Sequence, residues 1–558
     1  MSLPRLSSTG GAIPTPHPHT SASGRVAQVL LRTWAAATNL LICGRRFLLL
    51  TPPESEQTNY QGYVPIADAL DELLTGLGAH AHHGHGLNDA PLPLAHYAAI
   101  FDFTGLIEKH PETTVVHAHS TTDIHVIGPD NTELQDPHSS CPASAQARIA
   151  WARAHMPVTT AAVQRLAERG TLMDQRIGLS LVLEPKTAVL ALLLHEAGAT
   201  VSVFGHADEI RDDVAHYLRH QGIPVYGYAQ MSAQEEKHAA VDFLSQQLTV
   251  LLDDGSHLIR MAHEDAYAPV ALRHMIGAAE ETTSGLRPLR IMERDSALKI
   301  PVVASNDARS KTLFDNAYGT GQSCLFTIMD LLDANHEGLH MGGLHVLVIG
   351  YGDVGRGFAR LIRAFGAKVT ICDTDSVRLL QAYMDGYEVC ISPDAVAENM
   401  QWIVSATGVR HTINSSVLAC APDGCVLSVI GGVAQEIALE EAIAAGASWE
   451  PTGDRAVDIL RFADGRGLKV MDKGGCINCT AGEGNPIEIM DMSFGVQTAA
   501  VEYLLTGMNA RESRLHALPA TLDHGISQMA LKFFAPSASV LSDFSLKHDA
   551  ERRDTLRT

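Results

Sequence analysis

The residues whose types and spacing best fit a chemical task are three glycines in the stretch Gly350-Tyr-Gly352-Asp-Val-Gly355. They follow a short apolar run, residues 344–349, and precede a helix-like pattern that continues through Phe365. Glycines in such a strand–turn–helix context let the backbone approach a pyrophosphate, and the helix N-terminus offers N–H groups to it. The stretch therefore predicts a dinucleotide site.

An acidic residue follows at the position that such a site requires. Residues 368–372 form a second strand-like run that delivers Asp373, 18 residues after Gly355. A carboxylate there would accept hydrogen bonds from the ribose hydroxyls of NAD and would repel the additional phosphate of NADP. The sequence therefore predicts NAD as the cofactor, bound tightly.

A lysine and a carboxylate precede the glycines. Lys311 and Asp315 are four residues apart, so on a helix they would share one face. They could form a surface ion pair, or a lysine whose pKa is tuned by burial could act as a general base. Two more polar turns, Asp253-Asp254-Gly255 and residues 280–285, follow strand-like runs, where carboxylates face the ligand crevice of a parallel sheet. Each turn alone favours a structural role.

Composition limits the class of protein. A chain of 558 residues with 46% hydrophobic and 19% charged residues is typical of a globular enzyme of two or three domains. A net charge of −22 argues against nucleic acid as a partner. Scattered cysteines and an apolar N-terminal stretch interrupted by Arg32 favour a cytoplasmic protein without a membrane span. Cys476 and Cys479 have half of a zinc-type spacing, for which we favour chance, and no metal is expected.

The alternation of strand-like and helix-like segments predicts an α/β fold. We expect two Rossmann-like, doubly wound parallel-sheet lobes and an extra N-terminal α/β region. The histidine-rich residues 80–85 are expected to form an exposed loop rather than a metal site. The expected organisation is a disordered tail at 1–25, an extension at 26–145 that ends in a linker at 131–145, a substrate lobe at 146–335, an NAD lobe at 336–485, and a return to the substrate lobe with a C-terminal tail at 486–558.

Together the motifs resemble the S-adenosylhomocysteine hydrolase family. The family order is Asp-Asp-Gly (253–255), Glu-Glu-Thr-Thr-Ser-Gly (280–285), Asn-Asp-x-x-x-Lys-x-x-Phe-Asp-Asn (306–316) and Gly-Tyr-Gly-Asp-Val-Gly-Arg-Gly (350–357), and it continues through Asn478. The resemblance runs from about residue 148 to 516 and leaves the first 140 residues outside it.

The resemblance implies a redox cycle on a nucleoside. NAD would oxidise the sugar 3′-hydroxyl, the C4′ proton would become acidic, the 5′ substituent would leave, and the ketone would be reduced again. It implies that Lys311 and Asp315 handle the 3′-hydroxyl proton, Asp254 assists at C4′, and Glu281 and Asn316 hold the ribose. The residues that it places on NAD are Thr282, Thr283, Ser284, Gly350, Gly352, Asp353, Val354, Gly355, Asp373, Thr407, Ile430, Gly431 and Asn478.

The chain departs from the family pattern around the substrate. The family's His-Met-Thr is Val182-Leu183-Glu184 here, and its Ile-Gly-His-Phe-Asp is Ile430-Gly431-Gly432-Val433-Ala434, so two active-site histidines are missing. Its Gly-His-Pro is Gly484-Asn485-Pro486, a usual cysteine is Thr320, and the C-terminal Lys and Tyr have no clear counterpart.

Three interpretations follow. The first is a nucleoside lyase or dehydratase that eliminates a hydroxyl or another 5′ group and adds no water afterwards. A product with an exocyclic sugar alkene, as in angustmycin-type nucleoside antibiotics, would fit this reaction. The second is a divergent hydrolase that recruits Glu184 or Glu483. The third is a non-catalytic NAD-binding paralogue. Substrate-side candidates are Glu184, Thr187, Glu483 and Asn485. The family forms tetramers, so a homo-oligomer is expected.

Overall fold

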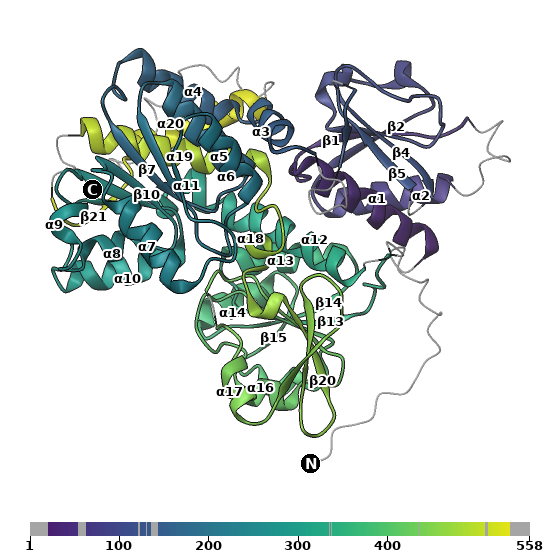
Figure 1. Cartoon of the computed structure of the whole chain (residues 1–558). Helices are drawn as coiled ribbons and strands as arrows, with labels where there is room; N and C mark the ends of the chain where they lie inside the picture. Colours follow the sequence, from purple (N-terminus) through teal and green to yellow (C-terminus); the bar gives the residue numbers. More distant parts are fainter. Residues whose placement is uncertain are drawn as a thin grey trace, which may run out of the picture.

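The computed structural model describes residues 21–53, 63–120, 123–129, 131–135, 143–333, 335, 338–433, 435–507 and 512–535. Within them the chain forms three β-sheets, each covered by helices (Figure 1). The expected α/β class, with two Rossmann-like lobes and an extra N-terminal region, is confirmed. No helix of the described chain is long and apolar enough to span a membrane.

The N-terminal module is built on a six-stranded sheet in the order β2-β1-β3-β4-β5-β6. The first four strands in this order are parallel, and β5 and β6 are antiparallel to their neighbours. Its elements are α1 (Ala22–Thr38), β1 (Arg46–Leu50), α2 (Tyr63–Gly76), β2 (His80–Gly84), η3 (Leu87–Asp89), η4 (Leu94–His96), β3 (Ala99–Asp102), β4 (Thr114–Ser120), β5 (Asp123–Ile127) and β6 (Glu133–Leu134).

The first lobe contains a parallel seven-stranded sheet in the order β21-β12-β11-β10-β7-β8-β9. Its central strands are buried on both faces, which explains their continuous apolar sequences. Its strands are β7 (Arg176–Ser180), β8 (Thr200–Phe204), β9 (Val225–Tyr226), β10 (Val250–Asp253), β11 (Gly277–Glu280), β12 (Val302–Ala304) and β21 (Leu515–Ala517). Its helices are α3 (Ala145–Ala154), α4 (Pro157–Glu168), α5 (Pro185–Glu196), α6 (Asp212–His220), α7 (Ala233–Leu244), α8 (His257–His263), α9 (Ala268–Ala271), α10 (Thr283–Arg294), η5 (Ser305–Asp307), α11 (Arg309–Thr312), η6 (Asp315–Gly319), α19 (Ile487–Thr506) and α20 (Ala520–Phe534).

The second lobe contains an eight-stranded sheet in the order β15-β14-β13-β16-β17-β20-β19-β18. Only the pairs β18–β19 and β19–β20 are antiparallel. Its strands are β13 (His345–Ile349), β14 (Lys368–Cys372), β15 (Glu388–Cys390), β16 (Trp402–Ser405), β17 (Val426–Val429), β18 (Ser448–Pro451), β19 (Val457–Arg461) and β20 (Gly467–Met471). Its helices are α12 (Thr320–Leu332), α13 (Asp353–Ala364), α14 (Ser376–Met384), α15 (Asp394–Ala397), α16 (Ser415–Cys420), α17 (Leu439–Ala444), η7 (Asp472–Gly474) and α18 (Ile477–Thr480).

Three local predictions need correction. Helix α1 begins at Ala22, capped by the Ser21 side chain, so residues 22–25 are helical rather than part of a disordered tail. The histidine run expected to be a loop forms the edge strand β2, whose residues pair with β1. The expected linker at 131–145 includes β6. The predictions for residues 1–20, for the remainder of the linker at 136–142 and for the tail after 535 lie outside the described residues.

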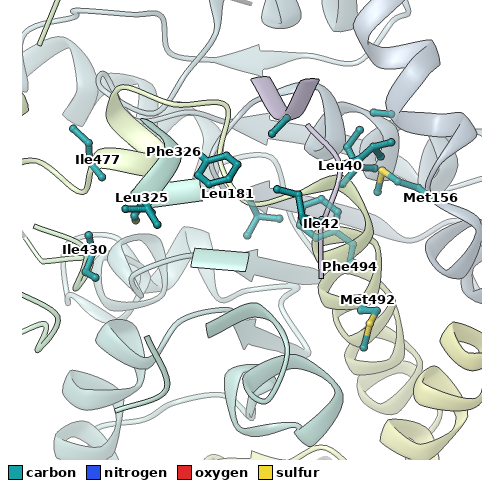
Figure 2. Close-up of a cluster of buried hydrophobic side chains, with 14 of the residues drawn as sticks. Leu40, Ile42, Met156, Leu181, Leu325, Phe326, Ile430, Ile477, Met492 and Phe494 are labelled. Carbon is teal, nitrogen blue, oxygen red and sulfur yellow. The ribbon is translucent and has the colours of Figure 1, made fainter. Parts of the chain in front are cut away.

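The segment that follows α1 docks the N-terminal module onto both lobes. Leu40 and Ile42 are buried in an apolar cluster with Phe326 of α12 and Phe494 of α19 (Figure 2). Gln322 of α12 donates to the Leu40 carbonyl and accepts from the Ile42 backbone N–H, both at 2.9 Å. The module is therefore attached to the two helices at which the chain leaves and re-enters the first lobe.

A buried ion pair strengthens this attachment. The Arg32 guanidinium of α1 is 1% exposed and lies 2.5 Å from Asp333, which follows α12, and 3.3 Å from Asp330. Removing one partner of a buried pair leaves the other charge desolvated, which costs far more than breaking an exposed pair.

We expect Arg32→Ala to lower the free energy of unfolding by about 3–5 kcal/mol, because Asp333 would keep a buried charge without its guanidinium. Urea unfolding followed by circular dichroism measures this. Arg153→Ala, which breaks the exposed pair with Glu196, is the matched control and should cost about 0–1 kcal/mol. Equal losses for the two variants would contradict the buried anchor.

Candidate active site

Two polar turns meet at the carboxyl edge of the first lobe's sheet. Strands β10 and β11 are parallel neighbours with Asp253 opposite Glu280, so the residues that follow each strand are adjacent. Glu280 accepts from the backbone N–H groups of Gly255 and Ser256 and from the Thr282 hydroxyl. Glu280 therefore ties the two turns together, and Asp254 and Glu281, which follow the two strands, both lie near Lys311.

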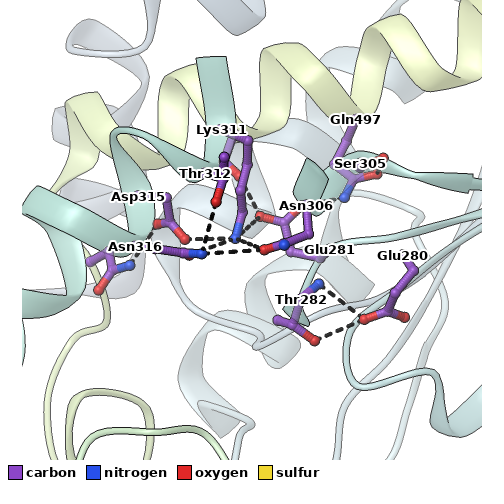
Figure 3. A network of polar contacts seen from close by, with 12 residues as sticks. Glu280, Glu281, Thr282, Ser305, Asn306, Lys311, Thr312, Asp315, Asn316 and Gln497 are labelled. Atoms are coloured by element: carbon purple, nitrogen blue, oxygen red, sulfur yellow. Dashed lines mark hydrogen bonds and ion pairs between the residues drawn. The ribbon is translucent and has the colours of Figure 1, made fainter. Parts of the chain in front are cut away.

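Lys311 lies at the centre of a polar network (Figure 3). Its ammonium is 2.8 Å from Asp315 and 3.9 Å from Glu281, and it donates to the side-chain oxygens of Asn306 and Asn316 at 3.2 and 3.3 Å. Lys311 is only 2% exposed, which excludes the surface ion pair that the sequence left open. The pair does not lie on one helix as expected, because α11 ends at Thr312 and a π-helical turn begins at Asp315.

The charges of the network determine which groups hold protons. Burial alone would lower the pKa of Lys311, but the adjacent Asp315 and Glu281 outweigh it and raise that pKa to about 12. Burial raises the pKa of Glu281 to about 7, although Lys311 opposes the shift. Burial likewise raises the pKa of Asp254. In this state Lys311 is therefore an ammonium that donates hydrogen bonds, and the groups that can change protonation near neutrality are carboxyls.

Asn485 reaches the same site from a loop remote in sequence. Its amide donates to Asp315 at 2.6 Å and to the Thr320 hydroxyl at 3.2 Å, and its oxygen accepts from Asn478 at 2.9 Å and from Ser323 at 2.7 Å. The sequence placed Asn485 beside the substrate. In the structure it lies between Asp315 and Asn478, where it connects the lysine network with a predicted NAD contact.

The glycine turn of the second lobe suits a dinucleotide. Gly350 has a φ of +103°, and a Cβ on Gly355 would lie 1.9 Å from the Gly350 carbonyl oxygen, so both positions require glycine. At Gly352, the N-cap of α13, a Cβ would approach only the Arg378 guanidinium, at 3.8 Å, so the entrance to the helix is open. Asp373, directly after β14, accepts from the Tyr351 backbone N–H and is held beside the turn. Asp353 and Val354 begin α13.

The remaining predicted cofactor contacts lie on loops of both lobes. Thr282 caps α10, which begins with Thr283 and Ser284. From the same helix, Arg287 donates to the carbonyls of Thr407 and Gly408, and so joins the two lobes. Ile430 and Gly431 follow β17, where Gly431 packs against Glu436.

The other three substrate-side candidates, unlike Asn485, are engaged in contacts away from Lys311. Lys186 pairs with Glu184 at 2.9 Å and donates to the Glu483 carbonyl at 2.8 Å. The Glu483 carboxylate pairs with Arg148 and Arg211 at 3.2 and 2.9 Å. The Thr187 hydroxyl donates to the carbonyl of Val182. Lys186, Glu184 and Glu483 thus belong to one cluster of charged side chains. Within the part of the chain that the structure describes, Glu184, Thr187 and Glu483 form no hydrogen bond or ion pair with Lys311 or Asp315.

One histidine at this edge was missed from the sequence. His206 follows β8, its Nδ1 lies 2.6 Å from the Glu236 carboxylate, and no described group is within hydrogen-bond distance of its buried Nε2. Burial would lower the pKa of His206, but Glu236 and neighbouring carboxylates raise it to about 9. Its charge also helps to lower the pKa of Asp254. Only its position after a parallel strand could have indicated it.

Sequence comparison identifies the relatives of the chain. A family model described as the S-adenosyl-L-homocysteine hydrolase NAD-binding domain matches residues 316–484. The S-inosyl-L-homocysteine hydrolase of Methanopyrus kandleri is 36% identical over 392 residues, which cover 69% of this chain and 89% of that protein. The adenosylhomocysteinase of Archaeoglobus fulgidus is 34% identical over 409 residues, 73% of this chain and 98% of that protein.

The chain belongs to the S-adenosylhomocysteine hydrolase family. The matched NAD domain contains the glycine turn and Asp373, so NAD is the cofactor and the predicted choice of dinucleotide is confirmed. In the described chain no group of three or more His, Cys, Asp or Glu side chains could hold a metal ion. The residues of the glycine turn, together with Asp373, are those that would hold the NAD.

The buried carboxyl of Glu281 gives a pH test of the site. Because folding raises its pKa from 4.5 to about 7, the folded protein retains a proton that the unfolded chain releases over that range. Its contribution to stability is therefore fully present below about pH 4.5 and is lost as pH rises through about 7.

The unchanged protein should lose stability as pH rises from about 5 to about 8, because Glu281 must ionise in a buried place, whereas Glu281→Gln should not. The free energy of unfolding of Glu281→Gln, minus that of the unchanged protein, should therefore be about 3 kcal/mol higher at about pH 8 than at about pH 5. Chemical unfolding at the two pH values measures this difference. The exposed Glu398→Gln should give the same difference at both values. A pH-independent effect of Glu281→Gln would show that this carboxyl is ionised at every pH tested.

Proposed function

We propose that this member of the S-adenosylhomocysteine hydrolase family is an NAD-dependent nucleoside dehydratase. The observation that supports the proposal is the contrast between two parts of the site. The Lys311 network is complete and buried, whereas Val182 and Gly432 stand where the family has histidines. Groups for sugar oxidation are present, and the family's groups for adding water to the intermediate are absent.

In the proposed reaction the bound NAD would supply reversible hydride acceptance at the sugar C3′. Lys311, already an ammonium, would donate a hydrogen bond to the 3′-oxygen and stabilise its negative charge. Asp315 and Glu281 are the carboxyls within its reach that could take the hydroxyl proton. Asn316, whose side-chain oxygen accepts from Lys311, would hold the ribose.

Elimination needs a base at C4′ and an acid at the 5′ oxygen. Asp254, whose pKa burial raises, would remove the C4′ proton once C3′ is a ketone. His206 would donate its Nε2 proton to the departing 5′-hydroxyl, with Glu236 orienting the ring through Nδ1. The C4′–H and C5′–O bonds break, a C4′–C5′ double bond forms, and water leaves. Reduction of the ketone then restores the 3′-hydroxyl.

Thioether hydrolysis is the second candidate, because the relatives at 34–36% identity are named as hydrolases of S-adenosyl- or S-inosylhomocysteine. It would need groups that add water to the intermediate in place of the missing histidines, and Glu184 and Glu483 are both committed to ion pairs. A non-catalytic role is disfavoured by the intact Lys311 network. In either catalytic case the substrate would be a small nucleoside. We also propose that the protein is a homo-oligomer.

Lys311 and His206 variants separate the two halves of the reaction. On mixing the NAD-loaded enzyme with a purine nucleoside, we expect Lys311→Ala to abolish the reduced-nicotinamide absorbance, since the 3′-alkoxide loses its stabilising charge. His206→Gln should still form reduced nicotinamide but should accumulate it, with turnover slowed about 10²- to 10⁴-fold. Stopped-flow absorbance measures both.

Exposed residues of the same types provide matched controls, Lys368→Ala and His216→Gln, which should behave as the unchanged enzyme. NAD content and melting temperature check that the variants are folded and loaded. Reduced nicotinamide formed normally by Lys311→Ala would contradict the proposed oxidation site. Unchanged turnover by His206→Gln would remove His206 from the mechanism without affecting the oxidation step.

A further inference from the structure

Two cysteines whose spacing was attributed to chance lie on either side of Asn478, a predicted NAD contact. Cys476 is the N-cap of α18, and Cys479 lies one turn later on the same short helix. Both thiols donate to the side-chain oxygen of Asn478, at 3.3 Å for Cys476 and 3.6 Å for Cys479. Two sulfurs that share one acceptor and are separated by two residues are placed for an intramolecular disulfide.

The two cysteines differ in exposure from the buried Cys324 nearby in the fold. Each is partly exposed, in contrast to Cys324, which is fully buried. The hydrogen bond that it shares with Cys476, and then burial, raise the pKa of the Cys479 thiol well above its usual value, so this thiol stays protonated and can donate. Two neighbouring thiols can undergo thiol–disulfide exchange with a small disulfide.

A chain of buried hydrogen bonds connects the pair with the lysine network. Asn478 donates to Asn485 at 2.9 Å, Asn485 donates to Asp315 at 2.6 Å, and Asp315 pairs with Lys311 at 2.8 Å. Each of these side chains is less than one-tenth exposed, so water does not readily replace a lost partner. The thiol donors therefore help to hold Asn478, and Asn478 in turn holds Asn485 against Asp315.

We propose that Cys476 and Cys479 are a reversible thiol–disulfide pair that tunes the NAD site. With a low-molecular-weight disulfide as oxidant, two S–H bonds break and one S–S bond forms, and the two electrons and two protons reduce the oxidant to two thiols. The oxidised pair donates no S–H to Asn478, which loses both donors. The inference rests on the NAD site of the proposed function and does not require dehydration to be the reaction.

The test uses the full-length protein, reduced and then incubated with oxidised glutathione. Free-thiol titration and peptide mass mapping should find one new disulfide, between Cys476 and Cys479. Calorimetric titration of NAD into NAD-depleted protein should give an affinity about fivefold to tenfold weaker for the oxidised form, as expected for the loss of one or two hydrogen bonds. Reduction with dithiothreitol should restore it.

Serine variants remove the sulfur and keep a hydroxyl donor. Cys476→Ser and Cys479→Ser should bind NAD as the reduced protein does and should no longer respond to oxidised glutathione. Cys420→Ser, at an exposed cysteine outside this loop, should retain the full response. None of these measurements uses turnover, so a failure of the dehydratase proposal would leave them interpretable.

Two results would overturn the inference. One is an oxidised protein in which Cys476 and Cys479 remain thiols, or in which the mapped disulfide joins other cysteines, such as Cys372 and Cys390, which lie opposite each other on β14 and β15. The other is a Cys476–Cys479 disulfide that leaves the affinity for NAD unchanged, which would show that Asn478 does not depend on the thiol donors.

Discussion

The burial of one ammonium group, that of Lys311, is the constraint on which the site depends. Removing a charge from water costs several kcal/mol unless partners replace the lost solvent, and here the partners are Asp315, Glu281, Asn306 and Asn316. They come from the ends of β11 and β12 and from the turn before α12, so the order of strands in the first lobe is what assembles them. Burial in the same cluster raises the pKa of Glu281 to about 7, although Lys311 opposes the shift.

The loop before α19 extends this dependence to the second lobe and to the N-terminal module. Asn485 fixes Asp315 from one side and Asn478 from the other. Two residues later, the Ile487 backbone N–H donates to the carbonyl of Asn39, whose side chain accepts from Lys186. The N-terminal module thus contacts the loop that holds Asp315, which gives residues beyond the family match a structural link to the Lys311 network.

The sequence was sufficient to predict features that depend on neighbouring residues alone. The apolar runs of β8 and β14 and the turn at Gly350 obey short-range rules, and the polar turns at Asp254 and Glu281 were placed by the rule that parallel strands end at one edge. It was not sufficient for contacts between distant segments. No period in the sequence links Asn485 with Asp315, 170 residues away, or His206 with Glu236. The histidine run of β2 lacks β-branched residues, and its strand is formed by pairing with β1.

The masses of the products that the NAD-loaded enzyme forms from candidate substrates distinguish nucleoside dehydration from thioether hydrolysis. The enzyme would be incubated separately with S-adenosylhomocysteine and with a panel of free purine nucleosides, including ketohexose nucleosides, and the products would be read by mass spectrometry. If the enzyme is a dehydratase, we expect a nucleoside lighter by one water and no release of homocysteine. Homocysteine release without any dehydrated nucleoside would contradict the dehydratase proposal and would show that the chain hydrolyses thioethers without the family's histidines.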